Sequence, residues 1–219
     1  MTKFAKTLGL VAASLLLLPT MSAQAADGIV LRPMLGLGYG FGGDTITPVT
    51  IVPEGTSIEY EETIKAGTGI DLRAGLEVAF PRTPFALQLA VAYQNDGAAG
   101  LDNKHIDFRR VPVELIGYWR VAPQVRVGLG VRKTTHADLR YSNSYCNQIK
   151  TELSSNTLPC SYSFKSTVGA ILEAEYELTP SWGLRARYVV ETFKLKDESL
   201  SDEKFRGDHL GILSVWYLR

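Results

Sequence analysis

Apolar and polar side chains alternate with a period of two along most of the chain. Such alternation predicts β-strands with one apolar and one polar face, and helical periodicity is scarce. We expect eight strands, over residues 30–41, 67–80, 85–94, 106–119, 124–135, 165–177, 182–194 and 206–218. Each is at least about as long as the ~9–11 residues that a tilted strand needs to cross a membrane.

The connections between these strands alternate in length. Residues 81–84, 120–123 and 178–181 form tight turns that contain proline, whereas residues 42–66, 95–105, 136–164 and 195–205 form longer polar loops. Short turns at one end and long loops at the other are typical of an antiparallel up-and-down transmembrane β-barrel. We therefore predict an all-β fold of this class.

The two strand faces differ sharply in charge. From the second to the seventh strand, the apolar face carries no charged residue, while the opposite face carries acids and arginines in equal number and no lysine. We expect the following residues to form an ion-paired network: Asp71, Arg73, Glu77, Arg110, Glu114, Arg126, Arg132, Glu173, Glu175, Arg185, Arg187 and Glu191.

The charged face can point outward, as in a soluble lipocalin-like barrel, or inward, as in a membrane barrel. A solvated face usually includes lysine, whereas buried ion pairs favour the bidentate fork of arginine. Balanced charge also suits an enclosed network, because an isolated buried charge is costly. Aromatic residues at both ends of the apolar face agree with the inward orientation: Phe80, Phe85, Trp119 and Tyr176 near the turns, and Tyr39, Phe41 and Tyr93 near the loops.

The first residues indicate export. Lys3 and Lys6 precede an apolar run over residues 8–18, and small residues at 23 and 25 suit a signal peptidase. We predict a signal peptide over residues 1–25 and a barrel domain over residues 26–219. The run is far shorter than the ~20 residues of a spanning helix, which argues against an uncleaved anchor. No cysteine follows the predicted cleavage site directly, which argues against a lipoprotein.

Charge and cysteine content narrow the partners. The chain has 23 basic and 23 acidic residues, so loss of Lys3 and Lys6 leaves a net charge near −2. This balance argues against nucleic acid, which needs a basic surface. Cys146 and Cys160 share one polar segment, so we expect a disulfide in an exported chain. A metal site is the alternative, although no histidine lies between or beside these cysteines.

With its alternation and proline-containing turns, the run Arg109–Tyr118 (RRVPVELIGY) resembles the outer membrane protein β-barrel domain family. That family is similar to the membrane domain of outer membrane protein A and to OmpX/Ail-type small barrels. The resemblance implies location in the outer membrane of a Gram-negative cell and assembly by the barrel assembly machinery. The family's last strand usually ends on an aromatic residue, whereas this chain ends in WYLR. The last strand is apolar on both faces, so its orientation stays unassigned.

The sequence gives little sign of catalysis. His209 is followed by Leu210 and Gly211, so the His-x-Ser motif that lipid A deacylases of this size carry is absent. Two His-x-Asp pairs occur, at 105–107 and 136–138, but no serine or cysteine is placed beside them as a nucleophile. We predict a non-enzymatic chain without a cofactor or metal.

The inward charges admit two interpretations. Eight strands leave a lumen just wide enough for side chains to fill, which makes a structural plug. Alternatively, same-strand pairs such as Arg73–Glu77 or Arg110–Glu114 exchange partners along a narrow ion path. Long side chains and balanced charge favour the plug.

Outside the lumen, Arg109, Lys133 and Lys194 share the lipid-facing side near the loops, where they contact lipopolysaccharide phosphates or merely extend to the membrane edge. The loop over 136–163 holds the cysteine pair and several tyrosines, which suit either a binding surface or a protective loop. We predict a monomeric barrel for envelope support and contact with an extracellular ligand or host surface. A porin-like pore for small solutes and a soluble ligand-binding barrel are the alternatives.

Overall fold

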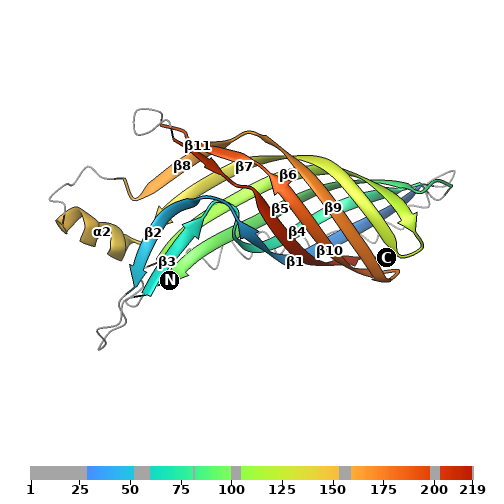
Figure 1. Ribbon diagram of the computed structural model, residues 1–219, viewed down its shortest axis with the longest axis horizontal. Coiled ribbons are helices and arrows are strands. Elements are labelled where there is room, and N and C mark those ends of the chain that lie inside the picture. Colours follow the sequence, from blue (N-terminus) through green and yellow to red (C-terminus); the bar gives the residue numbers. More distant parts are fainter. Residues whose placement is uncertain are drawn as a thin grey trace.

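The computed structural model describes residues 29–51, 60–80, 82–99, 105–152, 159–197 and 203–218. The predicted signal peptide lies outside them. Eight strands make the barrel (Figure 1): β1 (Val30–Gly42), β4 (Gly69–Ala79), β5 (Phe85–Ala99), β6 (His105–Ala122), β7 (Val125–Tyr141), β9 (Val168–Thr179), β10 (Trp182–Val190) and β13 (His209–Tyr217).

The barrel is closed and antiparallel throughout. From β1 to β10 each strand pairs with the next barrel strand along the chain, β10 pairs with β13, and β13 pairs back with β1 from Met34–Tyr217 to Gly42–His209. The predicted eight-stranded up-and-down barrel is confirmed. Closure leaves no unpaired edge around the barrel wall.

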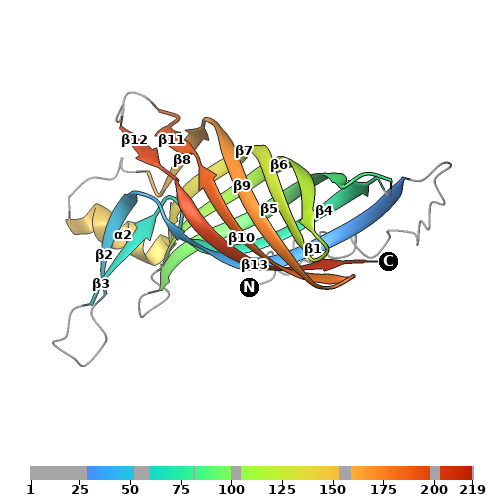
Figure 2. The same cartoon turned by 45° about the vertical axis from the view of Figure 1, so that its right-hand side comes forward.

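At one end the strands are joined by tight turns, and at the other end the structure continues beyond the barrel (Figures 1 and 2). We call this part the extension. It comprises the far ends of β5, β6 and β7, helix α2, and five short strands: β2 (Thr45–Ile51), β3 (Tyr60–Lys65), β8 (Ser161–Ser166), β11 (Thr192–Leu195) and β12 (Lys204–Arg206).

The sequence placed the strand ends less well than the strands themselves. β5 and β7 run five and six residues further into the extension than predicted, whereas β6 gains one residue there and three at the short-turn end. The predicted strands 165–177, 182–194 and 206–218 are each divided in two, by Thr167, Glu191 and residues 207–208. Beyond these breaks β8, β11 and β12 pair as a separate sheet that joins β7.

Apolar side chains cover the outside of the barrel and charged side chains fill the inside. Leu129, Val168 and Leu172 are 70%, 69% and 57% exposed on the outer face. Strand β13, whose orientation the sequence left open, buries His209, Leu213 and Tyr217 inside, and it exposes its alternate residues. A soluble barrel with a charged outer face is therefore wrong for this fold, and the arrangement is that of a membrane barrel.

The chain leaves the barrel after β1 through a glycine. Gly43 has a φ of +83°, and a Cβ there would stand 2.2 Å from the Gly67 backbone nitrogen. Only glycine adopts this conformation and this close approach without strain. The next residue, Asp44, joins two parts of the extension, since its carbonyl accepts from Ala66 and its carboxylate accepts from the Arg206 backbone.

Helix α2 (Asn143–Glu152) lies in the extension after β7 (Figure 1). The disulfide Cys146–Cys160 links it to the start of β8, with the two Cα atoms 5.5 Å apart. None of the helices in the described ranges is long and apolar enough to span a membrane.

Candidate functional site

The barrel lumen holds a continuous column of charged side chains. Each of the twelve residues that the sequence assigned to the charged face points inward and is at most 4% exposed. Eleven of them come from five strands, β4, β6, β7, β9 and β10, and Glu191 directly follows β10. Period-two alternation turns every second side chain of a barrel strand inward. The column is therefore the candidate site with the strongest physical constraint, since each buried charge needs a partner.

Glu114 lies at the centre of the middle part of the column. It accepts hydrogen bonds of 2.9 Å from both Arg73 and Arg187, and Arg132 is 3.4 Å away. Arg73 also forms a bidentate pair with Asp71, at 3.0 and 2.6 Å. The carboxylates of Asp71 and Glu114 thus contact guanidinium groups from three strands.

The part nearest the short turns is organised by Glu175. It accepts from Arg126 at 3.0 Å, from Arg185 at 2.7 Å, and from the hydroxyl of Tyr217 at 2.9 Å. Arg126 continues to Glu77 at 2.6 Å. One cross-section of the lumen is therefore filled by a connected set of side chains from β4, β7, β9, β10 and β13.

Toward the extension, Glu191 accepts from Thr134 at 2.5 Å and lies 3.2 Å from Arg132. Glu173 lies 3.3 Å from both Arg185 and Arg187, so it connects the middle part of the column to the part nearest the short turns. These contacts complete a network that runs most of the length of the lumen.

The two same-strand pairs that the ion-path interpretation named, Arg73–Glu77 and Arg110–Glu114, are not formed. Arg73 pairs with Asp71 and Glu114 rather than with Glu77, and Glu114 pairs across the lumen rather than with Arg110. Residues four apart on a strand are separated by about 13 Å, which is beyond ion-pair range. Partners across the lumen are closer, since the eight-stranded barrel is narrow.

Arg110 differs from the other arginines of the column. Its guanidinium donates to the backbone carbonyls of Ala66 and Thr68 and lies 5.3 Å from the centre of the Phe108 ring. It thus stands where the charged column meets the apolar interior of the extension.

Sequence reasoning missed several neutral members of the network. Gln94 donates to Asp71 and accepts from Arg132, Gln88 accepts from Arg185, and the Tyr118 hydroxyl donates to Glu173. All three occupy the alternate positions of their strands that face the lumen, so the period-two pattern could have identified them. Tyr217 could not be found this way, because β13 is apolar on both faces.

Above the column the interior of the extension is apolar. We call this group the loop-end cluster; its buried members are Ile64, Ala66, Ile106, Phe108, Ala137, Leu139, Phe164 and Phe193. The ring of Phe108 contacts those of Phe164 and Phe193 edge-on, with centroids 5.4 and 5.6 Å apart. Such contacts add to the free energy of apolar burial.

The tyrosines of the loop over 136–163 pack on this cluster. Tyr141 stacks on Tyr145 with centroids 5.9 Å apart and meets Tyr162 edge-on. Burial raises the pKa of the Tyr141 hydroxyl. The disulfide between Cys146 and Cys160 holds this part of the extension against the cluster.

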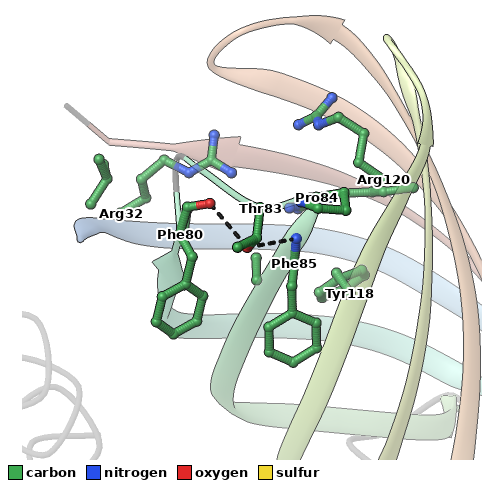
Figure 3. Close-up of a pocket in the computed structure, with 11 residues that line it drawn as sticks. Arg32, Phe80, Thr83, Pro84, Phe85, Tyr118 and Arg120 are labelled. Atoms are coloured by element: carbon green, nitrogen blue, oxygen red, sulfur yellow. Dashed lines mark hydrogen bonds between the residues drawn. The ribbon is translucent and has the colours of Figure 1, made fainter. Parts of the chain in front are cut away.

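A cavity of about 340 Å³ opens at the short-turn end of the lumen (Figure 3). Arg32 and Arg120 lie on either side of it. The hydroxyl of Thr83 stabilises the turn between β4 and β5, since it donates to the Phe80 carbonyl at 3.2 Å. Glu77 holds Arg32 and Glu177 holds Arg120, the latter through two contacts of 2.6 Å. Tyr118 and Arg126, which belong to the lumen network, also line the cavity.

The three basic residues expected at the lipid-facing rim all point outward, although each already has a contact. Arg109 pairs with Asp107 at 2.6 Å, and Lys133 donates to the Ser166 carbonyl. Lys194 lies in β11 between the inward-facing residues 193 and 195 of the loop-end cluster. They lie on different strands, β6, β7 and β11, at the junction of barrel and extension.

The two His–Asp pairs lie on the outer surface. His105 is 3.9 Å from Asp107, and His136 is 3.4 Å from Asp138, with both imidazoles more than half exposed. His209 is inside, and its Nδ1 lies 2.7 Å from the Gly207 carbonyl. Within the described ranges no three His, Cys, Asp or Glu side chains are grouped so as to hold a metal ion.

Comparisons with known proteins bear on both fold and location. The family model "Outer membrane protein beta-barrel domain" matches residues 13–212. Ail, the attachment invasion locus protein of Yersinia pestis, is 16% identical with a TM-score of 0.50, and the match covers 88% of this chain and 99% of Ail. Ail in complex with the heparin analogue sucrose octasulfate gives 13% identity, the same TM-score and the same coverage.

Neisserial surface protein A is 10% identical with a TM-score of 0.45, over 87% of this chain and 97% of that protein. None of the curated proteins matches the sequence. At these identities the structural likeness concerns the fold alone.

Proposed function

Because the chain belongs to the outer membrane protein β-barrel domain family, and so lies in the cell outer membrane, we propose that it is a sealed, non-catalytic barrel. In this proposal the barrel supports the envelope and holds the extension rigidly at the cell surface, where it contacts an extracellular ligand or host surface. The short turns then face the periplasm and the extension faces outward.

The filled lumen is the observation that carries this proposal. Twelve charged residues, each at most 4% exposed, bridge the lumen from wall to wall, and the apolar loop-end cluster covers them on the outer side. A solute would have to break several buried ion pairs to pass, and each such break is costly. We assign no catalytic step, since the histidines of both His–Asp pairs lie exposed on the outer wall.

Planar-bilayer recording tests the seal. The purified barrel is expected to give no uniform single-channel steps in 1 M KCl, while a Glu114→Ala and Arg187→Ala double variant opens the middle of the column and conducts. Reproducible steps from the wild-type barrel, changed in size by the double variant, would show a pore instead. Heat-modifiable migration on a gel controls for folding of both proteins.

A narrow ion path is the second candidate, and one observation favours it. Some ion pairs of the column are loose: Arg187 Nε is 3.3 Å from Glu173, and Arg187 Nη1 is 3.8 Å from Asp71, and neither nitrogen makes a hydrogen bond. Loosely held guanidinium groups can exchange partners. The cavity at the short-turn end would then be the inner mouth of the path.

Support of the envelope is tested in cells. A strain that lacks the chain is expected to become more sensitive to detergents and large antibiotics, and wild-type protein restores resistance. Under the proposal the barrel is a monomer assembled by the barrel assembly machinery, and Arg109, Lys133 and Lys194 contact lipopolysaccharide. Unchanged sensitivity in the deletion strain would contradict the supporting role.

A further inference from the structure

Three lysines lie directly opposite one another on the outer face of the extension. Lys194 of β11 is the register partner of Lys165 of β8 on one side and of Lys204 of β12 on the other. We call these three residues the rim lysine ladder. This register concentrates three positive charges on one face of neighbouring strands, where like charges repel each other.

The ladder faces outward because the alternate side chains are held inside. Phe164 and Phe193 are 4% and 0% exposed in the loop-end cluster, and Phe205 packs against them. The lysine next to each of these rings must then lie on the opposite face of the sheet. The side chain of Lys133 also reaches this region, since its ammonium donates to the carbonyl of Ser166, at the junction of β8 and β9.

The ladder stands just above the apolar band of the barrel. Val168 and Val190, 69% and 44% exposed, are the last apolar residues of their strands on the lipid-facing side. Lys165 lies three residues beyond Val168, and Lys194 lies four beyond Val190. At about 3.3 Å per residue and a tilt near 45°, these offsets are roughly 7 and 9 Å.

That height corresponds to the lipid headgroups. The headgroup layer of each leaflet is about 5–8 Å thick, so the phosphates of the outer leaflet lie level with the three ammonium groups. The described acids next to the ladder in sequence, Asp197 and Glu203, lie beyond the far ends of β11 and β12 and so further from the apolar band. Lys165 and Lys194 have contacts of their own, so the argument depends on their shared face and height.

From this register and height we infer that the rim lysine ladder binds phosphate groups of the outer-leaflet lipid, and so fixes the lipid-facing side of β8, β11 and β12 to lipopolysaccharide. This inference rests on the proposed placement of the barrel and replaces a single contact at Lys194 by a site of three residues. It also accounts for the choice of residue. Lysine is a compact, strongly hydrated charge that suits a wet headgroup layer, whereas the enclosed lumen uses arginine.

The test uses the full barrel in phosphatidylcholine nanodiscs and measures its affinity for bisphosphorylated lipid A. The variant Lys165→Gln, Lys194→Gln, Lys204→Gln is expected to bind on the order of 100-fold more weakly at low salt, from the usual attraction of each lysine to an anionic surface. A matched control removes three positive charges elsewhere, with Arg82→Gln, Arg140→Gln and Lys150→Gln. It is expected to bind like the wild type.

Equal affinity of the ladder variant and the wild type for lipid A would overturn the inference, as would equal binding of dephosphorylated lipid A by the wild type. Soluble inositol hexakisphosphate forms the second arm. If it bound the ladder as tightly as lipid A does, the site would serve a soluble anion and the assignment to lipid would be wrong. Should the triple variant fail to fold, Lys194→Gln alone is expected to weaken binding about fivefold.

The outcome is independent of the test for the sealed lumen. A wild-type barrel that conducts ions would refute the seal and leave the lipid A measurement unaffected. Conversely, a sealed barrel whose ladder variant binds lipid A normally would refute only the lipid site.

Discussion

Glu114 shows most clearly what a single residue does in the column, because it serves arginines of three different strands. We expect Glu114→Gln to lower the free energy of unfolding by about 3 kcal/mol, since breaking a buried pair leaves uncompensated charges inside the barrel. Urea titration of the barrel in lipid vesicles measures this change. The substitution keeps the shape of the side chain, so the loss would come from charge.

Glu177→Gln provides the matched control. Glu177 pairs with Arg120 through two contacts of 2.6 Å, shorter than those of Glu114, but the side chain of Arg120 is 36% exposed at the rim. Exposed pairs contribute up to about 1 kcal/mol. Equal losses for the two variants would contradict the view that enclosure makes the column sensitive.

At this scale, period-two alternation located the inward charges but not their partners. The strand direction fixes which face a side chain occupies, whereas the partner across the lumen depends on the stagger of strands far apart in sequence. That is why Arg73 meets Glu114 of another strand. Tyr217 was missed for a different reason. Strand β13 is apolar on both faces, so its sequence does not show which side chains point into the lumen.

Among the elements, the short strands of the extension depend on the loop-end cluster. Phe193 is fully buried and meets Phe108 edge-on. We expect Phe193→Ala to cost about 3–5 kcal/mol locally, so that β11 and β12 open while the barrel strands stay closed. Limited proteolysis should then cut near residues 195–205 in the variant before it cuts the wild type.

Phe41→Ala is the control for this change, because Phe41 is 55% exposed on the outer face. It is expected to leave the proteolysis pattern unaltered. If Phe193→Ala instead lowered the stability of the whole barrel, with no early cut in the extension, the extension and the barrel would unfold as one unit.

The extension was harder to predict than the barrel because the alternation changes phase where the two meet. In β7 the inward set passes from Arg132 and Thr134 to Ala137 and Leu139, at a register shift in the pairing with β6. A similar shift occurs at Thr167, between Ser166 and Gly169. An extra residue in a strand turns all later side chains to the other face. The run of polar residues at 132–136 gave no sign of it.

The whole molecule combines two interiors of opposite character, a charged column within the membrane and an apolar cluster above it. This order follows from the surroundings. Inside the apolar band the outer face must suit lipid, so polar side chains are left for the lumen. Above the band the outer face meets water and headgroups, so the apolar side chains turn inward and lysines turn outward.

Substitution of a lipid-facing residue tests this orientation directly. Leu129 is 70% exposed midway along the apolar part of β7, and Val121 is 56% exposed near the short turns. We expect Leu129→Arg to lower the free energy of unfolding in vesicles by about 2–4 kcal/mol and Val121→Arg by about 0–1 kcal/mol, since the cost of arginine falls toward the membrane surface. A barrel surrounded by water would tolerate both changes alike, because each adds a charge to a solvated face. Equal stability of the two variants would therefore place the apolar band outside the bilayer centre.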